Sequence, residues 1–339
     1  MLSVSRSLAR VWILSVKATV LLGLCGCKPP TETPTDPLAA LVASAEMGDA
    51  QAQLQLARAL SSADDASKNE SKAVIWYTRA AEQGLVDAQY ELGVLYYDGS
   101  LLPKDYGEAL KWFTLAAGKN HAGAQSKIGT MYINGHGVSK DVAEAIMWWT
   151  KAAEQGHAET QIGLGLGYFA GVLGFSKDDV TAAKWVTKAA EQGVAAGQNL
   201  LGHWYLTGTG VPIDYDKAFF WFTEAAKQGD ADGENSIGWM YRNGKGVPKN
   251  DAEAFSWFTK AAEQGHNLAQ SYLAMMYLSG EGVPVNFVQA YSWASIAAAH
   301  GESTADRIRD LVAEQMTPGQ IAEAQRISAA FKPKSGSAK

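Results

Sequence analysis

The stretch AQSKIGTMYINGHGVSKDVAEAIMWWTKAAEQG, residues 124–156, recurs in register along most of the chain. Its last six residues, Lys151-Ala-Ala-Glu-Gln-Gly156, return with few changes at 188–193, 224–229 and 260–265. Extending the register outward marks the ends of successive repeats, which lie 36 residues apart except for one interval of 37: Gly48, Gly84, Asn120, Gly156, Gly193, Gly229, Gly265 and Gly301. Seven repeats therefore span residues 49–301, and a repeat of this length is typical of stacked helix pairs.

The first half of each repeat has the pattern of a helix. We number the columns of the repeat from the residue that follows each repeat end. Columns 4, 8 and 12 carry residues such as Ala124, Ile128 and Tyr132, and a spacing of four places them on one face of a helix. Column 9 is often glycine, as in Gly129, although glycine in a helix costs up to about 1 kcal/mol. Because this destabilising glycine recurs in most repeats, we predict that a neighbouring helix approaches closely at column 9.

The second half of each repeat predicts another helix. One column holds Asn or Asp in every repeat, as expected of N-cap residues: Asn69, Asp105, Asp141, Asp178, Asp214, Asn250 and Asn286. Three residues later, Glu108, Glu144, Glu253 and Gln289 predict capping boxes. Column 28 is always tryptophan: Trp76, Trp112, Trp148, Trp185, Trp221, Trp257 and Trp293. We expect these rings to form the core against small residues, so that truncating a central one costs about 3–5 kcal/mol.

These patterns predict an all-α solenoid in which each helix pair covers its neighbour. The repeats occupy residues 38–301, and the first, which lacks the tyrosine and the Gly-x-Gly turn, is predicted to be an N-terminal cap. The fourth repeat has one extra residue near Gly171, which predicts a bulged loop. Residues 302–331 predict two capping helices, the second with Thr317 as N-cap and Pro318 at its first position. The tail, 332–339, is predicted to be disordered.

The N-terminus has the composition of an export signal. Arg6, Arg10 and Lys17 precede a short apolar run that is too short to span a membrane. Leu24-Cys25-Gly26-Cys27 resembles a bacterial lipobox, which implies a signal peptide over 1–26 and a lipid on Cys27; an ordinary secretory signal is the alternative. Residues 27–37 predict an extended Pro/Thr tether. Loss of residues 1–26 removes three positive charges and no acids, so the net charge moves from −6 to −9, which argues against a nucleic-acid partner.

The repeat resembles that of the Sel-one-like repeat (SLR) family, relatives of the tetratricopeptide repeat. The third repeat matches the family pattern at these positions: Ala124, Ile128, Gly129, Tyr132, Gly135, Gly137, Val138, Asp141, Ala145, Trp148, Lys151, Ala152, Ala153 and Gly156. The resemblance covers about residues 49–301 and implies a right-handed α/α superhelix of helix-turn-helix repeats. It also implies an adaptor for assembling complexes, often exported in bacteria.

Nothing in the sequence has the spacing of a catalytic or metal site, so we predict no enzyme, no cofactor and no metal ligand. His121, His157 and His266 share column 1, about one repeat apart, which is too far for one metal ion. The Gly-x-Gly turns lack the strand and the Gly-Lys-Ser/Thr sequence of a phosphate loop. Some cysteine-rich relatives have been proposed to bind or hydrolyse β-lactams, but this chain has no cysteine after Cys27.

A partner surface is predicted on the first helices. If these line the concave side, as in tetratricopeptide relatives, columns 3, 6, 10, 13 and 14 face inward. They carry residues that change from repeat to repeat: Asp87, Tyr90, Tyr97, Asp98, Ile133, Asn134, Phe169, Asn199, His203, Asn235, Trp239, Arg242 and Asn243. Exposed aromatic residues and an arginine are typical of protein hot spots. Packing of Phe169 and Trp239 between adjacent repeats is the alternative.

The sequence thus predicts a scaffold that is anchored by lipid in a bacterial cell envelope and binds a protein or peptide on its concave surface. Lys28 after the lipidated cysteine is similar to outer-membrane lipoproteins of Gram-negative cells, which implies the periplasmic face of that membrane. Binding of peptidoglycan or another glycan is the alternative, since Asn and aromatic side chains also suit sugars. A β-lactam-type hydrolase is a further alternative.

Overall fold

The computed structural model describes residues 36–62 and 66–334, without the side chains of 66–70. These residues form 17 helices and no strands. The helices are α2 (Pro37–Glu46), α3 (Ala50–Ser61), α4 (Ala66–Glu82), α5 (Val86–Asp98), α6 (Tyr106–Ala117), α7 (Ala122–Asn134), α8 (Val142–Glu154), α9 (Ala158–Ala170), α10 (Asp179–Glu191), α11 (Ala195–Thr207), α12 (Tyr215–Ala226), α13 (Ala231–Asn243), α14 (Asp251–Glu263), α15 (Asn267–Ser279), α16 (Phe287–Ala299), α17 (Ser303–Ala313) and α18 (Pro318–Ala330).

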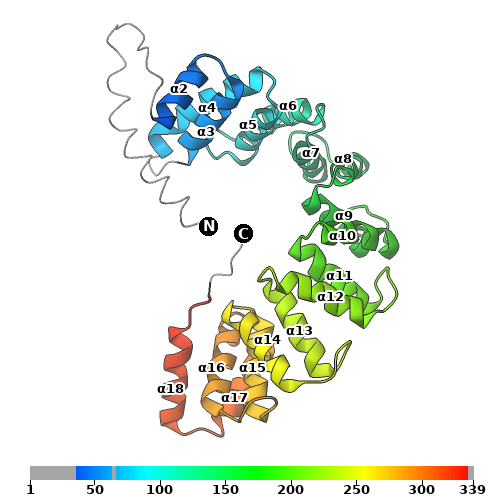
Figure 1. The fold of residues 1–339 in the computed structure, drawn as a ribbon, viewed down its shortest axis with the longest axis vertical. Coiled ribbons are helices and arrows are strands. Elements are labelled where there is room, and N and C mark those ends of the chain that lie inside the picture. The colour runs from blue at the N-terminus through cyan, green and yellow to red at the C-terminus, as the bar shows by residue number, and fades with distance from the viewer. Residues whose placement is uncertain (1–35, 63–65, 335–339) are drawn as a thin grey trace. The chain divides into compact units, whose positions relative to one another are not determined.

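Each repeat is one helical hairpin, which confirms the predicted all-α repeat solenoid. The odd-numbered helices α3 to α15 are the first helices of the seven repeats, and the even-numbered helices α4 to α16 are the second helices (Figure 1). The chain forms two compact units that divide between Gln155 and Gly156. Within each unit, the second helix of a hairpin also packs against the first helix of the next, as α12 does against α13.

The ends of the helices follow the predicted capping residues with one exception. The side chains of Asp105, Asp141, Asp178, Asp214, Asn250 and Asn286 accept hydrogen bonds from backbone N–H groups in the first turns of α6 to α16. The prediction was wrong for Asn69, because α4 already begins at Ala66. The predicted boxes at α6, α8, α14 and α16 form only their N-cap half; among the described helices, a closed capping box joins Thr317 and Gln320 of α18.

The interior of each hairpin is built on the column-9 glycine. An added Cβ on Gly202 would lie 2.6 Å from Phe222 of the paired helix, and one on Gly238 would lie 2.8 Å from Phe258. The predicted close approach is therefore confirmed. Its partner is the residue in column 29, the one after the tryptophan.

The prediction that the column-28 tryptophans are the core residues was wrong for most repeats. Trp148, Trp221 and Trp257 are only partly buried, whereas Phe222 and Phe258 beside them are fully buried. The exposed ring faces are covered by lysines three residues further on: the Lys151 and Lys260 Nζ atoms lie 4.4 Å and 3.7 Å from the Trp148 and Trp257 ring centroids. The tryptophans therefore lie at the boundary between core and solvent, where a cation can contact the ring.

The fourth repeat contains the expected longer loop between α9 and α10. Leu173 has a φ of 55° and lies next to Gly174 with a φ of 84°, so two consecutive residues are left-handed. Phe175 is buried and contacts Tyr168 edge-on, with a ring-centroid distance of 5.0 Å. The extra residue is thus accommodated in the loop, which Phe175 anchors to α9.

The N-terminal end of the array differs from the prediction. Asp36 caps α2, which begins at Pro37, so the last tether residue is helical. Leu38, Leu41 and Val42 of α2 pack on the small cluster around Leu56 of α3. Because α2 covers α3, the first repeat is not itself the terminal layer. Cys27 and the signal peptide lie outside the described residues.

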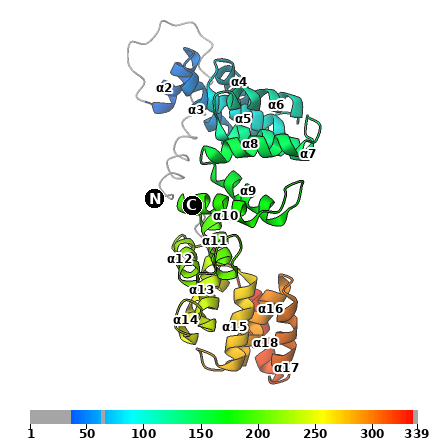
Figure 2. The same ribbon diagram turned by 90° about the vertical axis from the view of Figure 1, so that its right-hand side faces the viewer.

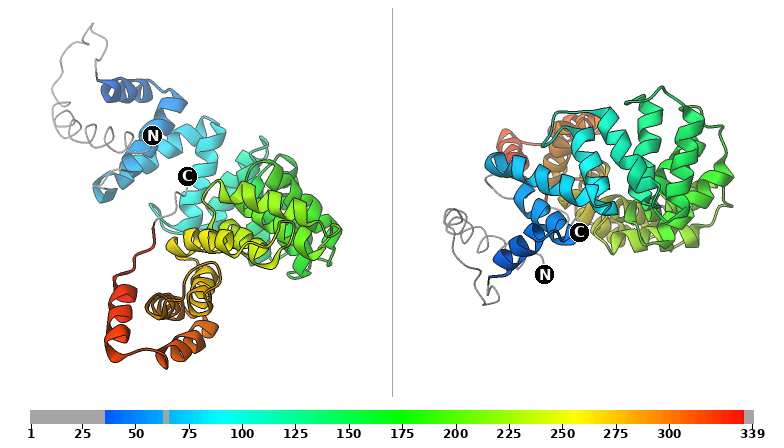
Figure 3. Two further views of the ribbon diagram at one scale, coloured as in Figure 1. Left: turned by 60° about the horizontal axis from the view of Figure 1, so that its bottom comes forward. Right: turned by 90° about the horizontal axis from the view of Figure 1, so that it is seen from above.

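At the C-terminal end, α17 and α18 are two helices at the places where two capping helices were predicted, and both pack against α16 (Figure 2). The Ser292 hydroxyl of α16 donates to the Ala324 carbonyl of α18 at 3.1 Å. The described part of the tail continues from the end of α18 to Lys334 (Figure 3). The Lys334 backbone N–H donates to the Glu263 carbonyl at 2.8 Å, and its ammonium pairs with the Glu263 carboxylate. The prediction of disorder was therefore wrong for residues 332–334.

In the described part of the chain, no helix combines the length and the apolar character needed to cross a membrane.

Candidate functional site

The first helices α11, α13 and α15 of the second unit together present the surface that we call the first-helix face. It is defined by columns 3, 10 and 14, whose exposed members include Asp232 and Leu268, His203, and Thr207 and Asn243. These columns lie opposite columns 4 and 8, which are buried, because residues on a helix recur about every 3.6 positions. The first-helix face is therefore the side of each hairpin that its own second helix leaves uncovered.

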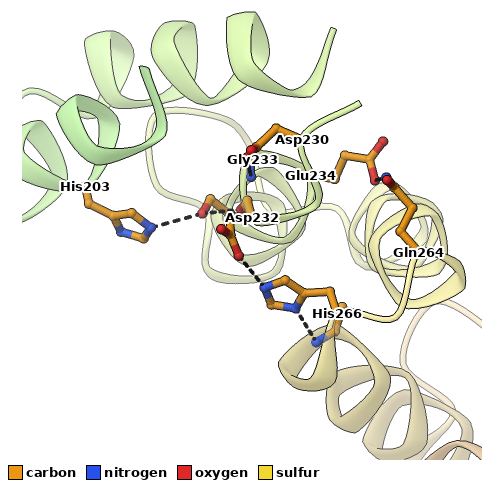
Figure 4. Close-up of polar contacts among 9 residues, drawn as sticks. His203, Asp230, Asp232, Gly233, Glu234, Gln264 and His266 are labelled. Carbon is orange, nitrogen blue, oxygen red and sulfur yellow. Dashed lines mark hydrogen bonds and ion pairs between the residues drawn. The ribbon is translucent and has the colours of Figure 1, made fainter. Parts of the chain in front are cut away.

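Polar side chains run across this face from one repeat to the next (Figure 4). His203 Nε2 of α11 lies 3.3 Å from the Ser236 hydroxyl of α13, and that hydroxyl donates to the Asp232 carbonyl at 2.8 Å. The Asp232 carboxylate lies 3.0 Å from His266 Nε2, at the start of α15. Figure 4 shows Asp232 between the two imidazoles. Three successive repeats are thus joined by polar side chains, of which Ser236 is buried and the other three remain at least partly open to solvent.

The proton positions in this row follow from the hydrogen bonds. His266 Nδ1 accepts from the Ala269 backbone N–H at 3.1 Å, so its proton is on Nε2, which donates to Asp232. That bond lowers the pKa of Asp232 against the opposing effect of desolvation. Desolvation lowers the pKa of His203, whose ring lies edge-on against Phe222 at 4.9 Å, while the charge of Asp232 opposes the shift. The row therefore favours ionised Asp232 beside neutral His203.

The meeting of Ser236, His203 and Asp232 does not form a nucleophilic triad. A triad needs the hydroxyl to donate to a histidine whose other nitrogen donates to the carboxylate. Here the Ser236 hydroxyl donates to a backbone carbonyl, and the Asp232 carboxylate is bonded to His266 instead of His203. The geometry favours a structural link between repeats. Among the described residues there is also no group of three or more His, Cys, Asp or Glu that could hold a metal ion.

Arg242 and Trp239, both on α13, belong to the contact between the last repeats. Arg242 donates to Glu281 at 3.0 Å and lies over the Tyr272 ring, 5.5 Å from its centroid. Trp239 packs against the core clusters of two successive hairpins and is partly buried. The alternative of packing between adjacent repeats therefore describes Trp239, which still exposes part of its surface. Asn243 is exposed and donates to the Trp239 carbonyl at 2.8 Å.

Three other predicted surface residues of the second unit lie in less open places. Asn199 and Asn235, in column 6, are partly buried, and their Oδ1 atoms are enclosed without a hydrogen-bond partner. Phe169 is exposed, yet its ring lies 5.7 Å from that of Trp204 in the next repeat. Columns 6 and 13 therefore lie at the edge of the face, toward the following repeat.

The first unit shows the same division. Tyr90 stacks on His121 of the next repeat at 4.5 Å, and Asp87 lies 3.9 Å from the same imidazole. The Tyr97 hydroxyl lies 3.0 Å from His136 Nδ1, and burial raises the pKa of that tyrosine. The remaining predicted residues lie at the ends of α5 and α7: Asp98 and Asn134 are exposed, and Ile133 is partly buried. Half of the predicted residues in this unit thus contact the neighbouring repeat.

The role of the column-1 histidines was missed by sequence reasoning, which considered them only as metal ligands. His121, His157 and His266 are the N-caps of α7, α9 and α15, each accepting a backbone N–H of the first turn through its ring. Asp49 and Asp230 do the same in other repeats. These aspartates in the same column, directly before a predicted helix, were the signal that could have identified the caps.

Comparisons with known proteins support this architecture. The sequence model of the Sel1 repeat matches seven consecutive stretches: 50–85, 86–121, 122–157, 158–194, 195–230, 231–266 and 267–302. A crystal structure of a Sel1 repeat protein from Oxalobacter formigenes is similar over 93% of this chain and 96% of its own, with 29% identity and a TM-score of 0.66. The crystal structure of c5321, a protective antigen of uropathogenic Escherichia coli with an SLR fold, covers 87% and 94%, with 25% identity and a TM-score of 0.42. No curated protein matches the chain.

Proposed function

Because the chain belongs to the Sel1 repeat family, whose members commonly mediate protein–protein interaction, we propose that it is a non-catalytic adaptor that binds a protein or peptide on the first-helix face. The family is generally non-enzymatic, and no catalytic family is indicated for this chain. The proposal is more specific than the family, since it names a surface on α11, α13 and α15.

One observation carries this proposal: exposed columns of the first-helix face differ between repeats whose buried columns hardly change. Column 10 presents His203 and then the partly exposed Trp239, and column 14 presents Thr207 and then Asn243. The columns beneath them keep the same kinds of residue, as in Leu201 and Ile237. A surface of varied polar and aromatic groups on a constant support is suited to recognition of a particular partner.

The experiment compares two added side chains on one hairpin. Asn243→Arg places a long cation on the first-helix face, and Ser256→Arg places the same group on the exposed side of α14, the paired second helix. Each variant is used as bait in envelope extract, and the captured proteins are quantified by mass spectrometry. We expect Asn243→Arg to lower recovery of the main partner at least tenfold and Ser256→Arg to leave it unchanged.

Equal recovery with both variants would rule out the first-helix face as the binding surface. Retention of the wild type on isolated peptidoglycan sacculi, lost in Asn243→Arg, would indicate a wall glycan as the ligand. In that case the first-helix face would still be the binding surface, but its ligand would be a glycan instead of a protein.

We also propose that the adaptor is exported and anchored by lipid on Cys27 in a bacterial cell envelope, at the periplasmic face of the outer membrane. The basic stretch, the apolar run and Gly26 before Cys27 support this proposal. Labelling cells with an alkyne fatty acid tests it: the wild type and Cys25→Ser should carry label, and Cys27→Ser should not. Label on Cys27→Ser, or none on the wild type, would contradict the anchor.

A further inference from the structure

Buried glutamines in column 5 of the first helices form a second set of links between repeats, which we call the glutamine ladder. Its members are Gln53, Gln89, Gln125, Gln161, Gln198 and Gln270, all of them buried. In the sixth repeat, the same column holds Glu234, which is 7% exposed. The chain thus contains one acid among six amides in equivalent surroundings, so the six serve as internal controls.

The glutamine side chain uses both ends of its amide. Its Nε2 donates to the carbonyl eight residues earlier, at the end of the preceding second helix: Gln125 to Ala117 at 3.4 Å, Gln198 to Ala190 at 3.3 Å and Gln270 to Ala262 at 3.1 Å. In several repeats its Oε1 accepts from a glutamine just after the second helix of its own hairpin, as Gln198 does from Gln228 at 2.8 Å. One amide therefore joins three helices.

Glu234 keeps only half of this pattern. Its Oε2 accepts from Nε2 of Gln264, the C-cap residue of α14, at 2.7 Å, as a glutamine would. An ionised carboxylate has no hydrogen to donate to the Ala226 carbonyl, which occupies the place of Ala190 and Ala262 at the end of α12. A protonated carboxyl group has such a hydrogen. In shape and hydrogen bonding, the acid form of Glu234 is therefore the counterpart of glutamine.

The charges around Glu234 do not compensate for its burial. Lys260 of α14 favours ionisation, whereas Asp230 at the start of α13 and Glu263 of α14 oppose it. Glu263 is itself paired with Lys334 of the tail. Figure 4 shows the Glu234 side chain turned toward Gln264, away from the pair formed by Asp232 and His266. Desolvation outweighs the bond from Gln264 and raises the pKa of Glu234.

We propose that Glu234 is a proton-operated link between repeats, which joins α12, α13 and α14 as the glutamine ladder does when it is protonated and loosens that junction when it is ionised. The binding function proposed above is independent of this link. A group whose pKa is raised in the folded state contributes stability that is full below the unfolded value, about 4.3 for Glu, and that is lost as pH rises through the folded value. The junction is therefore tightest in mild acid.

The main experiment records thermal unfolding of the full chain between pH 4 and pH 8. Glu234→Gln restores the amide found in the other repeats, so we expect it to raise Tm at pH 8 by about 2–4 °C. Its advantage over the wild type should shrink as pH falls, since the protonated wild type already forms the link. The reciprocal variant Gln198→Glu should acquire a new loss of stability with rising pH, because Gln198 is buried and donates to Ala190.

Carbon-13 NMR titration of the Glu234 carboxyl group in the wild type provides a readout that needs no variant. We expect its midpoint above the ordinary value for glutamate, about 4.3. A midpoint at or below that value would overturn the proposal. So would a Glu234→Gln variant whose Tm differs from the wild type by the same amount at every pH.

Discussion

The interior of each hairpin and the first-helix face are both built from repeated columns, yet they are held together differently. In the interior, a glycine meets a large side chain, as Gly202 meets Phe222, and the contact is apolar and sealed. On the face, each junction has its own polar contact, such as Asp232 with His266 or Arg242 with Glu281. The interior is close-packed, so a change in side-chain volume there lowers stability. A polar contact near water can change with little effect on stability.

The largest expected effect on stability comes from removing a buried ring from the interior of a hairpin. Phe222 of α12 is fully buried, while Phe220, two residues earlier, is 52% exposed. Phe222→Ala should lower the free energy of unfolding by about 3–5 kcal/mol, because it leaves a cavity in the hairpin. Phe220→Ala should change it by less than about 0.5 kcal/mol.

Urea unfolding followed by circular dichroism measures both changes, with amide exchange in α11 and α12 to locate them. Similar losses for the two variants would mean that the core and the surface are not distinguished as the structure describes.

An effect of intermediate size is expected for Gly202→Ala. The sign of its change in stability separates packing from helix propensity. Gly202→Ala should stabilise α11 by about 0.5–1 kcal/mol if only propensity mattered. The new methyl group would lie 2.6 Å from Phe222, so we expect a loss of about 1–3 kcal/mol instead. In a Phe222→Leu background the two changes should be non-additive, with the penalty for alanine reduced.

The same unfolding assay decides the sign for Gly202→Ala. A gain in stability in the otherwise wild-type chain would show that the hairpin has room at this glycine.

The smallest expected effect lies on the first-helix face. Because His266 lowers the pKa of Asp232 in the folded state, the ionised form contributes stability above the unfolded pKa, about 3.9 for Asp. That contribution is lost as pH falls through the folded value. Asp232→Asn should therefore lower the free energy of unfolding near neutral pH, by less than about 1 kcal/mol for so exposed a pair, and the difference should vanish in acid.

Urea titrations at several pH values measure this change, with Asp216→Asn as the control, because Asp216 is an exposed aspartate in the first turn of α12, outside the row formed by His203, Asp232 and His266. A difference for Asp232→Asn that grows toward acid would contradict the assigned pair.

Periodicity predicted the parts of the fold that depend on local chemistry. The N-cap column, the column-9 glycines and the two helices α17 and α18 were all recognised from residue type and spacing. The error with the tryptophans has a physical reason. Columns 28 and 29 are neighbours, and a large residue in both, as in Trp221 and Phe222, leaves their burial undecided without the angle at which the next helix packs.

The candidate site was less accessible to prediction. The columns chosen for it contained both the exposed positions, such as Asn243, and positions that contact the next repeat, such as Tyr90 and Arg242. A helical wheel places all of these on one side, since it holds only the angle around one helix. Which of them meet solvent depends on the neighbouring first helix.

The sequence alone determined that the chain is a helical array of seven repeats, because capping, glycine spacing and apolar stripes are local and each was present several times over. Only the tertiary structure decided which large residue of each hairpin is buried, which variable side chains bridge to the next repeat, and that the single acid of the glutamine ladder is enclosed among three helices. Burial is a property of what surrounds a side chain. Residues such as Ala226, Glu234 and Gln264 come together only when successive hairpins stack, so their interaction has no local signature.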